Sequence, residues 1–348
     1  MKRPRVTLQD VAARAGVGSA TVDRVINERG QVSEEVTRKV LDTARALGLR
    51  RVLPAGYRSM VRLNLVLARP ERPFITRMAM EFHRLGQRLE RNITVHRTIL
   101  KSEAPDAIAA AMARSEFDAV IVDAPDHPLI HQTIADLTFQ GRPVVTIISD
   151  VPGSARLAYA GTDHYKAGRS AGYFLARMAV PDFRQGKVIV LCHHLGMQAH
   201  AERVRGLTDH LAAQAPHLTL AEIVRGGDDP LLSEVKLKEA FLRHPETVGI
   251  YNAGAGNRGV VAAMRADLLA HRPIFIGHEL TAFTYACLRD GLMTLTIDQS
   301  PELQAQYAVE VLMNHFGFDG ATHATPPYVS TVPIVLYGPE NLPDAVPD

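Results

Sequence analysis

The sequence has little cysteine and no long apolar run. Only two of its 348 residues are cysteine, which excludes a small fold stapled by disulfides. Cys192 lies in an apolar run and Cys287 in a predicted helix, so we expect buried thiols in a reducing compartment. The longest apolar runs, such as residues 144–148 and 188–192, are far shorter than the roughly 20 residues of a membrane helix. The sequence therefore predicts no membrane partner.

Targeting and catalytic motifs are also missing. The basic start, residues 1–5, leads into polar residues without the apolar segment of a signal peptide, so we expect a cytoplasmic protein. No nucleophile elbow, P-loop or zinc-protease motif occurs. His193, His194 and His200 lack the spacing of zinc ligands and have no partner cysteine. The sequence predicts neither a catalytic residue nor a metal site.

One glycine pattern favours a different class of protein. Gly254, Gly256 and Gly259 form Gly-x-Gly-x-x-Gly after an apolar run, and Glu279 follows 20 positions later. Those are the terms of the dinucleotide-binding fingerprint. Such a fingerprint normally opens its domain, whereas this one lies deep in the chain, so we expect no cofactor. An NAD-dependent oxidoreductase is kept as the alternative function.

Charge is distributed unevenly along the chain. The composition, 46% hydrophobic and 22% charged, is that of a globular chain with two or three domains. Residues 1–62 contain 13 Lys and Arg against 6 Asp and Glu, whereas residues 63–348 contain 26 against 31. A basic head on a mildly acidic body indicates a nucleic-acid-binding module fused to something else. The alternative for the head is a solvated basic tail.

The first 47 residues contain the signals of three short helices. Thr7 and Asp10 have the spacing of a capping box, and Gly16 stands where that helix must end. A second helix fits residues 19–27, and Ser33 can cap a third. Two helices joined by a short turn and packed on a third form a helix-turn-helix.

The segment from Val6 to Asn27, VTLQDVAARAGVGSATVDRVIN, resembles the amino-terminal signature of the LacI family of bacterial transcription regulators. The resemblance implies that the second helix enters the major groove of double-stranded operator DNA. Arg24 would bond a guanine, with a phosphate contact as the alternative. The residues implied to contact DNA are Thr7, Ser19, Ala20, Thr21, Arg24 and Asn27.

Three features depart from the family pattern. Gly18 and Asp23 stand where the family has serines, and an acid beside phosphate weakens binding unless it is paired. The linker, residues 47–60, lacks the family's Pro-Asn pair and contains Pro54 and Gly56. Whether it forms a hinge helix stays open. Because any helix there is short, we expect residues 50–60 to be ordered only on DNA.

From residue 63 onward, apolar runs alternate with helical stretches. This pattern predicts parallel sheets wound by helices on both faces, with ligands at the carboxyl ends of the strands. The predicted strands are residues 63–67, 119–122, 144–148, 188–191, 248–251, 273–276 and 292–297. The fold class is therefore α/β, with a small all-α helix-turn-helix head followed by two doubly wound subdomains.

Residues 62 to about 338 are similar to the type I periplasmic sugar-binding fold. The motifs are short but ordered: residues 160–163, 202–206, 277–281 and 298–301. The resemblance implies two subdomains with a cleft between them, crossed three times by the chain. The expected boundaries are 1–60 for the head and 61–340 for the effector domain, in which the N-subdomain covers about 61–160 and 292–322 and the C-subdomain about 161–291 and 323–340.

The same resemblance implies a set of effector-binding residues. Phe74 would stack on a sugar ring, and the residues implied to bond its hydroxyls are Asp126, Arg169, Arg203, Asn252, Glu279 and Gln299. For each, a surface salt bridge or a strand-end cap is the alternative. The family usually has aspartate at the position of Glu279. We expect a homodimeric, non-enzymatic repressor controlled by a neutral or weakly charged sugar or polyol.

Overall fold

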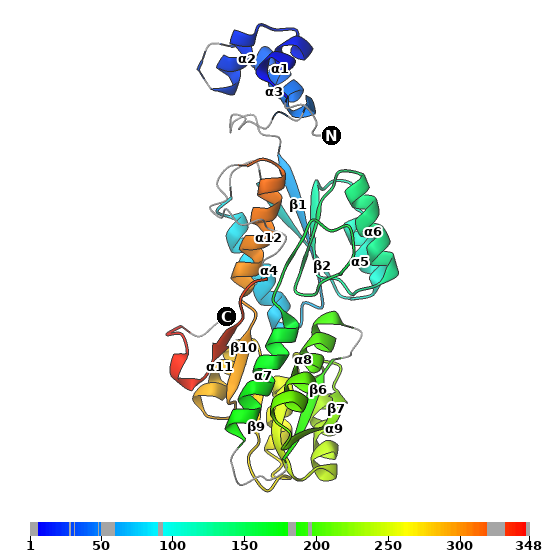
Figure 1. Cartoon of the computed structure of the whole chain (residues 1–348), viewed down its shortest axis with the longest axis vertical. Helices are drawn as coiled ribbons and strands as arrows, with labels where there is room; N and C mark the ends of the chain where they lie inside the picture. Colours follow the sequence, from blue (N-terminus) through cyan, green and yellow to red (C-terminus); the bar gives the residue numbers. More distant parts are fainter. Residues whose placement is uncertain are drawn as a thin grey trace.

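The computed structural model describes residues 6–27, 29–30, 32–47, 49, 60–89, 93–179, 186–193, 197–318 and 331–345. Three helices form a head next to the amino-terminal strand of two α/β subdomains (Figure 1). In the described part of the chain, no helix has both the length and the apolar character needed to cross a membrane. The linker with Pro54 and Gly56, and with it the question of a hinge helix, lies outside the described residues.

The head confirms the predicted helices. They are α1 (Leu8–Ala15), α2 (Ser19–Ile26) and α3 (Glu34–Leu47). Thr7 and Asp10 form the capping box, and Gly16 ends α1 at φ 65°, a left-handed conformation that costs glycine little. The buried core of the head consists of Val11, Ala12, Ala15, Val22, Val25, Ile26, Val40, Leu41 and Ala44.

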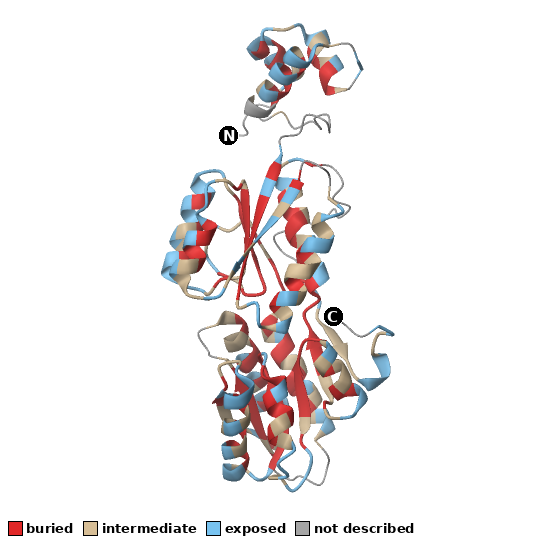
Figure 2. Cartoon of the chain, turned by 180° about the vertical axis from the view of Figure 1, so that it is seen from behind, coloured by how far each residue is buried: buried red, intermediate tan, exposed pale blue. Residues whose placement is uncertain are grey.

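The first subdomain is a parallel five-stranded sheet in the order β2-β1-β3-β4-β5. Helices α4 and α12 cover one face and α5 and α6 the other, so both faces are buried (Figure 2). The bounds are β1 Val61–Ala68, α4 Pro73–Gly86, β2 Ile93–Leu100, α5 Pro105–Met112, β3 Ala119–Val122, α6 Pro128–Phe139, β4 Val144–Ile147, β5 Ala158–Ala160 and α12 Pro301–His315.

The second subdomain is a six-stranded sheet in the order β11-β10-β9-β8-β6-β7, in which only β11 runs antiparallel. Helices α7 and α8 pack on one face and α9, α10 and α11 on the other. The bounds are α7 His164–Met178, β6 Gly186–Cys192, α8 Gln198–Gln214, β7 Leu218–Arg225, α9 Pro230–Arg243, β8 Thr247–Asn252, α10 Asn257–Met264, β9 Ile274–His278, α11 Ala282–Arg289, β10 Leu295–Asp298, β11 Val335–Tyr337 and a 3₁₀ turn at Pro339–Asn341. Cys192 and Cys287 are free and buried.

The chain returns to the first subdomain later than expected. The sequence assigned residues 292–322 to the N-subdomain, but β10 pairs with β9 in the second sheet. Helix α12 then packs in the core of the first sheet. The apolar run therefore ends as strand β10 in the second sheet, and the chain crosses to the first subdomain only after it. The crossing falls at Ser300, which has φ 51° and directly precedes Pro301, the first residue of α12. The boundary at 292 is therefore wrong by about one strand.

Two glycines bring α7 and α8 into backbone contact. A Cβ on Gly168 would lie 2.0 Å from the carbonyl oxygen of Arg203, and one on Gly206 would lie 2.1 Å from that of Tyr165. No larger residue fits at either position without moving a helix. This close approach sets the depth at which Arg203 enters the space between the sheets.

Candidate functional site

A small cavity of about 80 Å³ lies between the two sheets. It is lined mainly by residues that follow the strands, where ligands of doubly wound folds bind. We call it the cleft. Its lining is Arg72, Phe74, Ile75, Asp123, Ile148, Ser149, Met197, Ala199, His200, Arg203, Asp228, Gly254, Ala255, His278, Glu279 and Gln299.

Arg203 projects from α8 and is 3% exposed. Its Nε donates to His164 Nδ1 at 3.3 Å, and its Nη1 donates to the carbonyl of Ala253 at 2.8 Å. His164 Nε2 lies 2.6 Å from the carbonyl oxygen of Ile148, so that nitrogen carries the imidazole proton. Burial lowers the pKa of His164 to about 3, and Arg203 adds to the effect. The imidazole is therefore neutral and links α8 to the end of β4.

Glu279 ends β9 in a left-handed conformation, with φ 69°. The amide of Gln299 donates to Glu279 Oε1. Burial, together with the nearby charge of Asp298, raises the pKa of Glu279 to about 8, so the carboxyl holds its proton at pH 7. Three buried atoms here have no hydrogen-bond partner among the described residues: Glu279 Oε2, Gln299 Oε1 and His278 Nδ1. Such atoms are rare in protein interiors and indicate a place for a polar ligand.

Asp123 lies on the opposite wall and directly follows β3. It accepts a hydrogen bond from the backbone N–H of Ser149 at 3.3 Å. Burial raises the pKa of Asp123 to about 6. It is therefore mostly ionised at pH 7 and can accept from ligand hydroxyls.

Four charged side chains join the two subdomains at the edge of the cleft. Arg72 Nη1 lies 3.0 Å from Glu103 Oε2, and Arg72 Nε lies 3.3 Å from Asp228 Oδ2. His193 Nε2 lies 3.0 Å from Glu103 Oε1, and His193 Nδ1 lies 4.0 Å from Asp228 Oδ2. The hydrogen bond from His193, helped by Arg72, lowers the pKa of Glu103 to about 2. This cross-cleft ring takes two side chains from each subdomain.

The structure brings four of the seven expected effector residues into the cleft: Phe74, Arg203, Glu279 and Gln299. Asn252 lies just behind it. Its amide nitrogen donates to Asn257 Oδ1 at 2.6 Å, and its oxygen accepts from Gly254 N at 3.2 Å. Asn252 thus holds the turn after β8 in place.

Asp126 and Arg169 do not line the cleft. Asp126 is half exposed, pairs with His131 at 2.7 Å and borders a separate shallow groove beside Gly153. Arg169 stacks over the ring of Tyr165, with 5.9 Å to the centroid. The expectation that either contacts the effector is therefore wrong for this arrangement. Asp126 stands four residues past the end of β3, where the chain has already turned away.

The expected effector residues do not include Arg72, Asp123, Ser149 and Asp228, all of which line the cleft. Asp123 had a readable signal, because it is the first residue after β3. Arg72 is the residue before Pro73 at the start of α4. Asp228 depends on the turn after β7, a strand that the apolar runs did not reveal.

Backbone strain gathers around the cleft. Ile148, Asp228, Glu279 and Ser300 all have left-handed φ between 51° and 69°, which is unfavourable for non-glycine residues and most of all for β-branched isoleucine. Ile148 is held there because its carbonyl accepts from Tyr159 Oη at 2.9 Å and its N–H donates to Gln304 Oε1 at 3.1 Å.

The glycine pattern serves packing. A Cβ on Gly254 would lie 2.7 Å from Asp228 Oδ1, one on Gly256 2.5 Å from Leu191 Cδ2, and one on Gly259 2.6 Å from the carbonyl of Pro230. The three glycines thus permit close packing around the turn between β8 and α10.

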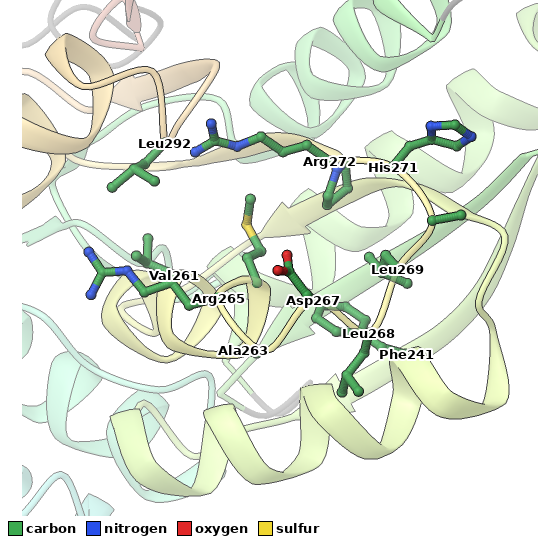
Figure 3. Close-up of a pocket in the computed structure, with 13 residues that line it drawn as sticks. Phe241, Val261, Ala263, Arg265, Asp267, Leu268, Leu269, His271, Arg272 and Leu292 are labelled. Carbon is green, nitrogen blue, oxygen red and sulfur yellow. The ribbon is translucent and has the colours of Figure 1, made fainter.

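A second cavity, of about 380 Å³, lies at the other end of the second subdomain, before β9 begins. Phe241, Leu268 and Leu269 contribute apolar walls. Figure 3 shows Arg265 and Arg272 extending toward the Leu292 side while His271 points away from it.

The head presents a small polar surface. Ser19, Ala20 and Arg24 on α2 are exposed. Asp23 is paired within the head, because Asn27 Nδ2 donates to its Oδ1 at 2.7 Å and Arg29 Nη1 lies 3.3 Å from its Oδ2. The acid that departs from the expected serine is thus partly neutralised, though by Arg29 and not by Arg24.

Comparisons with known proteins agree with this arrangement. Residues 7–50 match the model of bacterial regulatory proteins of the lacI family, and residues 66–319 match that of a periplasmic binding protein domain. No curated protein matches the chain.

Solved structures share the fold of the two subdomains. A sugar-binding protein of a Bacillus halodurans ABC transporter is 21% identical, with 80% of this chain and 98% of that chain covered and a TM-score of 0.69. The glucose-galactose binding protein GanP of Geobacillus stearothermophilus is 20% identical (82% and 99% covered, TM-score 0.72). A solute-binding protein of Burkholderia graminis, in complex with D-arabinose, is 16% identical (83% and 99% covered, TM-score 0.72).

Proposed function

Because the chain belongs to the LacI family of bacterial regulatory proteins and carries a periplasmic binding protein domain, we propose that it is a transcriptional repressor whose operator affinity is controlled by a sugar or polyol bound in the cleft. The observation that carries the proposal is the joining, in one chain, of an exposed helix-turn-helix and a buried cleft with unpartnered polar atoms. The proposed division is residues 1–60 for DNA and 61–340 for the effector.

The DNA-binding half of the proposal rests on the outer face of α2. Arg24 can make a bidentate contact to guanine, while Ser19 and Ala20 reach only a hydroxyl partner or a thymine methyl group. One such helix reads few base pairs, so we propose a homodimer on a near-palindromic site with half-sites about one helical turn apart. A chromosomal operator would place the protein in the cytoplasm.

The effector half rests on the chemistry of the cleft. Carboxyl, amide and guanidinium groups around Phe74 suit hydroxyl groups that both donate and accept. Two proteins of the same fold carry sugars in their structures, D-arabinose in that of Burkholderia graminis and α-D-tagatopyranose in that of Agrobacterium vitis. The effector controls DNA binding only if it binds one state of the two subdomains better than the other.

The dinucleotide alternative finds less support. The glycines of its motif pack closely against protein atoms, and the motif lies deep in the chain, whereas such a fingerprint normally opens its domain. We expect calorimetric titration of the protein with NAD to detect no binding. Saturable NAD binding would instead favour the oxidoreductase.

The test begins with DNA. Genomic fragments captured by the purified full-length chain should share a near-palindromic site, and fluorescence anisotropy on that site should change when the matching sugar is added. Arg24→Ala should weaken specific binding by about 1–3 kcal/mol and relax preference at one base pair per half-site. Arg205→Ala, an exposed arginine of the second subdomain, is the control and should bind normally. Equal loss by Arg24→Ala on all sequences would make Arg24 a phosphate contact.

A further inference from the structure

The three arginines around the cleft differ in how their charges are balanced. Arg72 lies within 3.3 Å of two carboxylates, and Arg77 Nη1 lies 2.6 Å from Asp298 Oδ2. Their side chains keep 14% and 16% of their surface exposed. Arg203 is 3% exposed, yet among the described residues no carboxylate oxygen lies within the 4.0 Å that defines an ion pair. The most buried of the three charges is the one without a counter-ion.

The partners that Arg203 does have are neutral. They are the imidazole of His164 and the carbonyl of Ala253. The nearby acids face other groups, since Asp298 pairs with Arg77, Asp228 pairs with Arg72, and Asp123 on the opposite wall accepts from the backbone of Ser149. Glu279, where the family usually has an aspartate, is protonated at pH 7 because burial raises its pKa to about 8. A buried charge is costly unless it is paired, and Arg203 has no acidic partner among the described residues.

From this buried, unpaired guanidinium we infer that the effector is a polyhydroxylated monocarboxylate, a sugar acid whose carboxylate pairs with Arg203. The inference rests on the function proposed above and names the chemical class of the ligand. A guanidinium matches a carboxylate in a two-point, charge-assisted contact. A neutral sugar supplies only hydroxyl oxygens at that place.

The rest of the cleft suits the other end of such a molecule. Asp123, on the opposite wall, accepts from hydroxyl groups and repels a second carboxylate. Protonated Glu279 can donate from Oε2, which makes no hydrogen bond among the described residues and lies 3.9 Å from Arg77 Nη1, and Gln299 Oε1 can accept. The carboxylate thus faces Arg203, the hydroxyl groups find partners on both walls, and a second carboxylate would be repelled by Asp123.

Calorimetry on the full-length protein at pH 7 tests the inference with matched pairs of ligands. Aldonates are compared with alditols of the same carbon skeleton: gluconate with glucitol, galactonate with galactitol, arabinonate with arabinitol, xylonate with xylitol. Glucuronate and galacturonate are compared with glucose and galactose, which separates a carboxylate at carbon 1 from one at the far end. At least one acid should bind ten times more tightly than its neutral partner.

Variants tie the preference to the guanidinium. Arg203→Met should abolish the preference for the acid, and Arg203→Lys, which keeps the charge without the fork, should retain part of it. Arg205→Met removes the same charge from the exposed side of the same helix and should change nothing. Circular dichroism confirms folding, and the wild-type panel decides the question even if Arg203→Met does not fold.

Two outcomes overturn the inference alone. Neutral sugars that bind as tightly as the acids would leave the proposed function standing without a carboxylate, and an acid preference that survives in Arg203→Met would move the carboxylate elsewhere. A panel in which no member binds or alters DNA affinity would contradict the polyhydroxylated effector itself.

Discussion

The two subdomains hold their cleft groups in different states. In the first subdomain, Arg72 is paired with two acids and Asp123 accepts from the backbone at Ser149. In the second, Arg203 has no counter-ion and three buried polar atoms at His278, Glu279 and Gln299 have no partner among the described residues. The first wall also has a buried atom without a hydrogen-bond partner among the described residues, Ser149 Oγ, so the clearest difference between the walls is the missing counter-ion of Arg203.

This difference indicates a division of labour. Polar groups that are buried without partners cost free energy until a ligand satisfies them. We therefore expect the second subdomain to supply most of the ligand's binding energy and the first to close over it through the cross-cleft ring. Functional sites commonly cost stability in this way.

The largest expected effect is on the pH dependence of the free energy of unfolding, to which Glu279 contributes. Its pKa is raised from 4.5 to about 8, so the folded state binds an extra proton between these values, and stability falls as pH rises through that window. Glu279→Gln cannot titrate. The wild type should lose about 4 kcal/mol relative to the variant between pH 5 and pH 9, measured by urea denaturation across that range. A constant difference would show that Glu279 is ionised throughout.

The next largest effect comes from the helix contact that places Arg203. Gly168→Val puts a side chain against the backbone of α8, whose carbonyl oxygen would lie 2.0 Å from the new Cβ. Overpacking of this kind should lower the free energy of unfolding by about 3 kcal/mol, measured by urea denaturation. The control, Gly86→Ala in the first subdomain, meets only Val95 at 3.8 Å and should be neutral. Equal effects would mean that α7 and α8 can separate freely.

The smallest effect concerns the ring that joins the two walls. A double-mutant cycle of Arg72→Gln and Asp228→Asn should give a coupling of about 1 kcal/mol in the free energy of unfolding, because this pair is largely buried. The surface pair Arg243 and Glu222, 51% and 30% exposed, should give a coupling near zero. A cross-cleft coupling as small as that of the surface pair would contradict closure by the ring.

The sequence predicted central strands and missed strands that are half exposed. All seven apolar runs lie in or overlap strands, because these strands are covered on both faces and read as continuous apolar segments. Strands β2 and β7 lie at sheet edges and alternate between partly buried and exposed residues. Because these two strands contain no continuous apolar segment, a criterion based on apolar segments does not distinguish them from polar loops.

The cleft was predictable where a residue directly follows a strand. Gln299 and Glu279 each come first after β10 and β9, and both line the cleft. The choice of Asp126 over Asp123 was wrong because a side chain four residues past a strand depends on the path of the loop. The ring could not be predicted, since Glu103 and His193 lie 90 residues apart in sequence and meet only when the subdomains do.

The imidazole of His164 has a consequence for how the cleft can open. Its single proton must lie on Nε2 to reach the Ile148 carbonyl, which leaves Nδ1 to accept from Arg203. His164 thus bonds to both subdomains. Separating the subdomains at this point would remove a hydrogen-bond partner from the buried guanidinium of Arg203. We therefore expect the hinge between the subdomains to lie near His164, and the cleft to open at the opposite edge, where Arg72 pairs with Asp228.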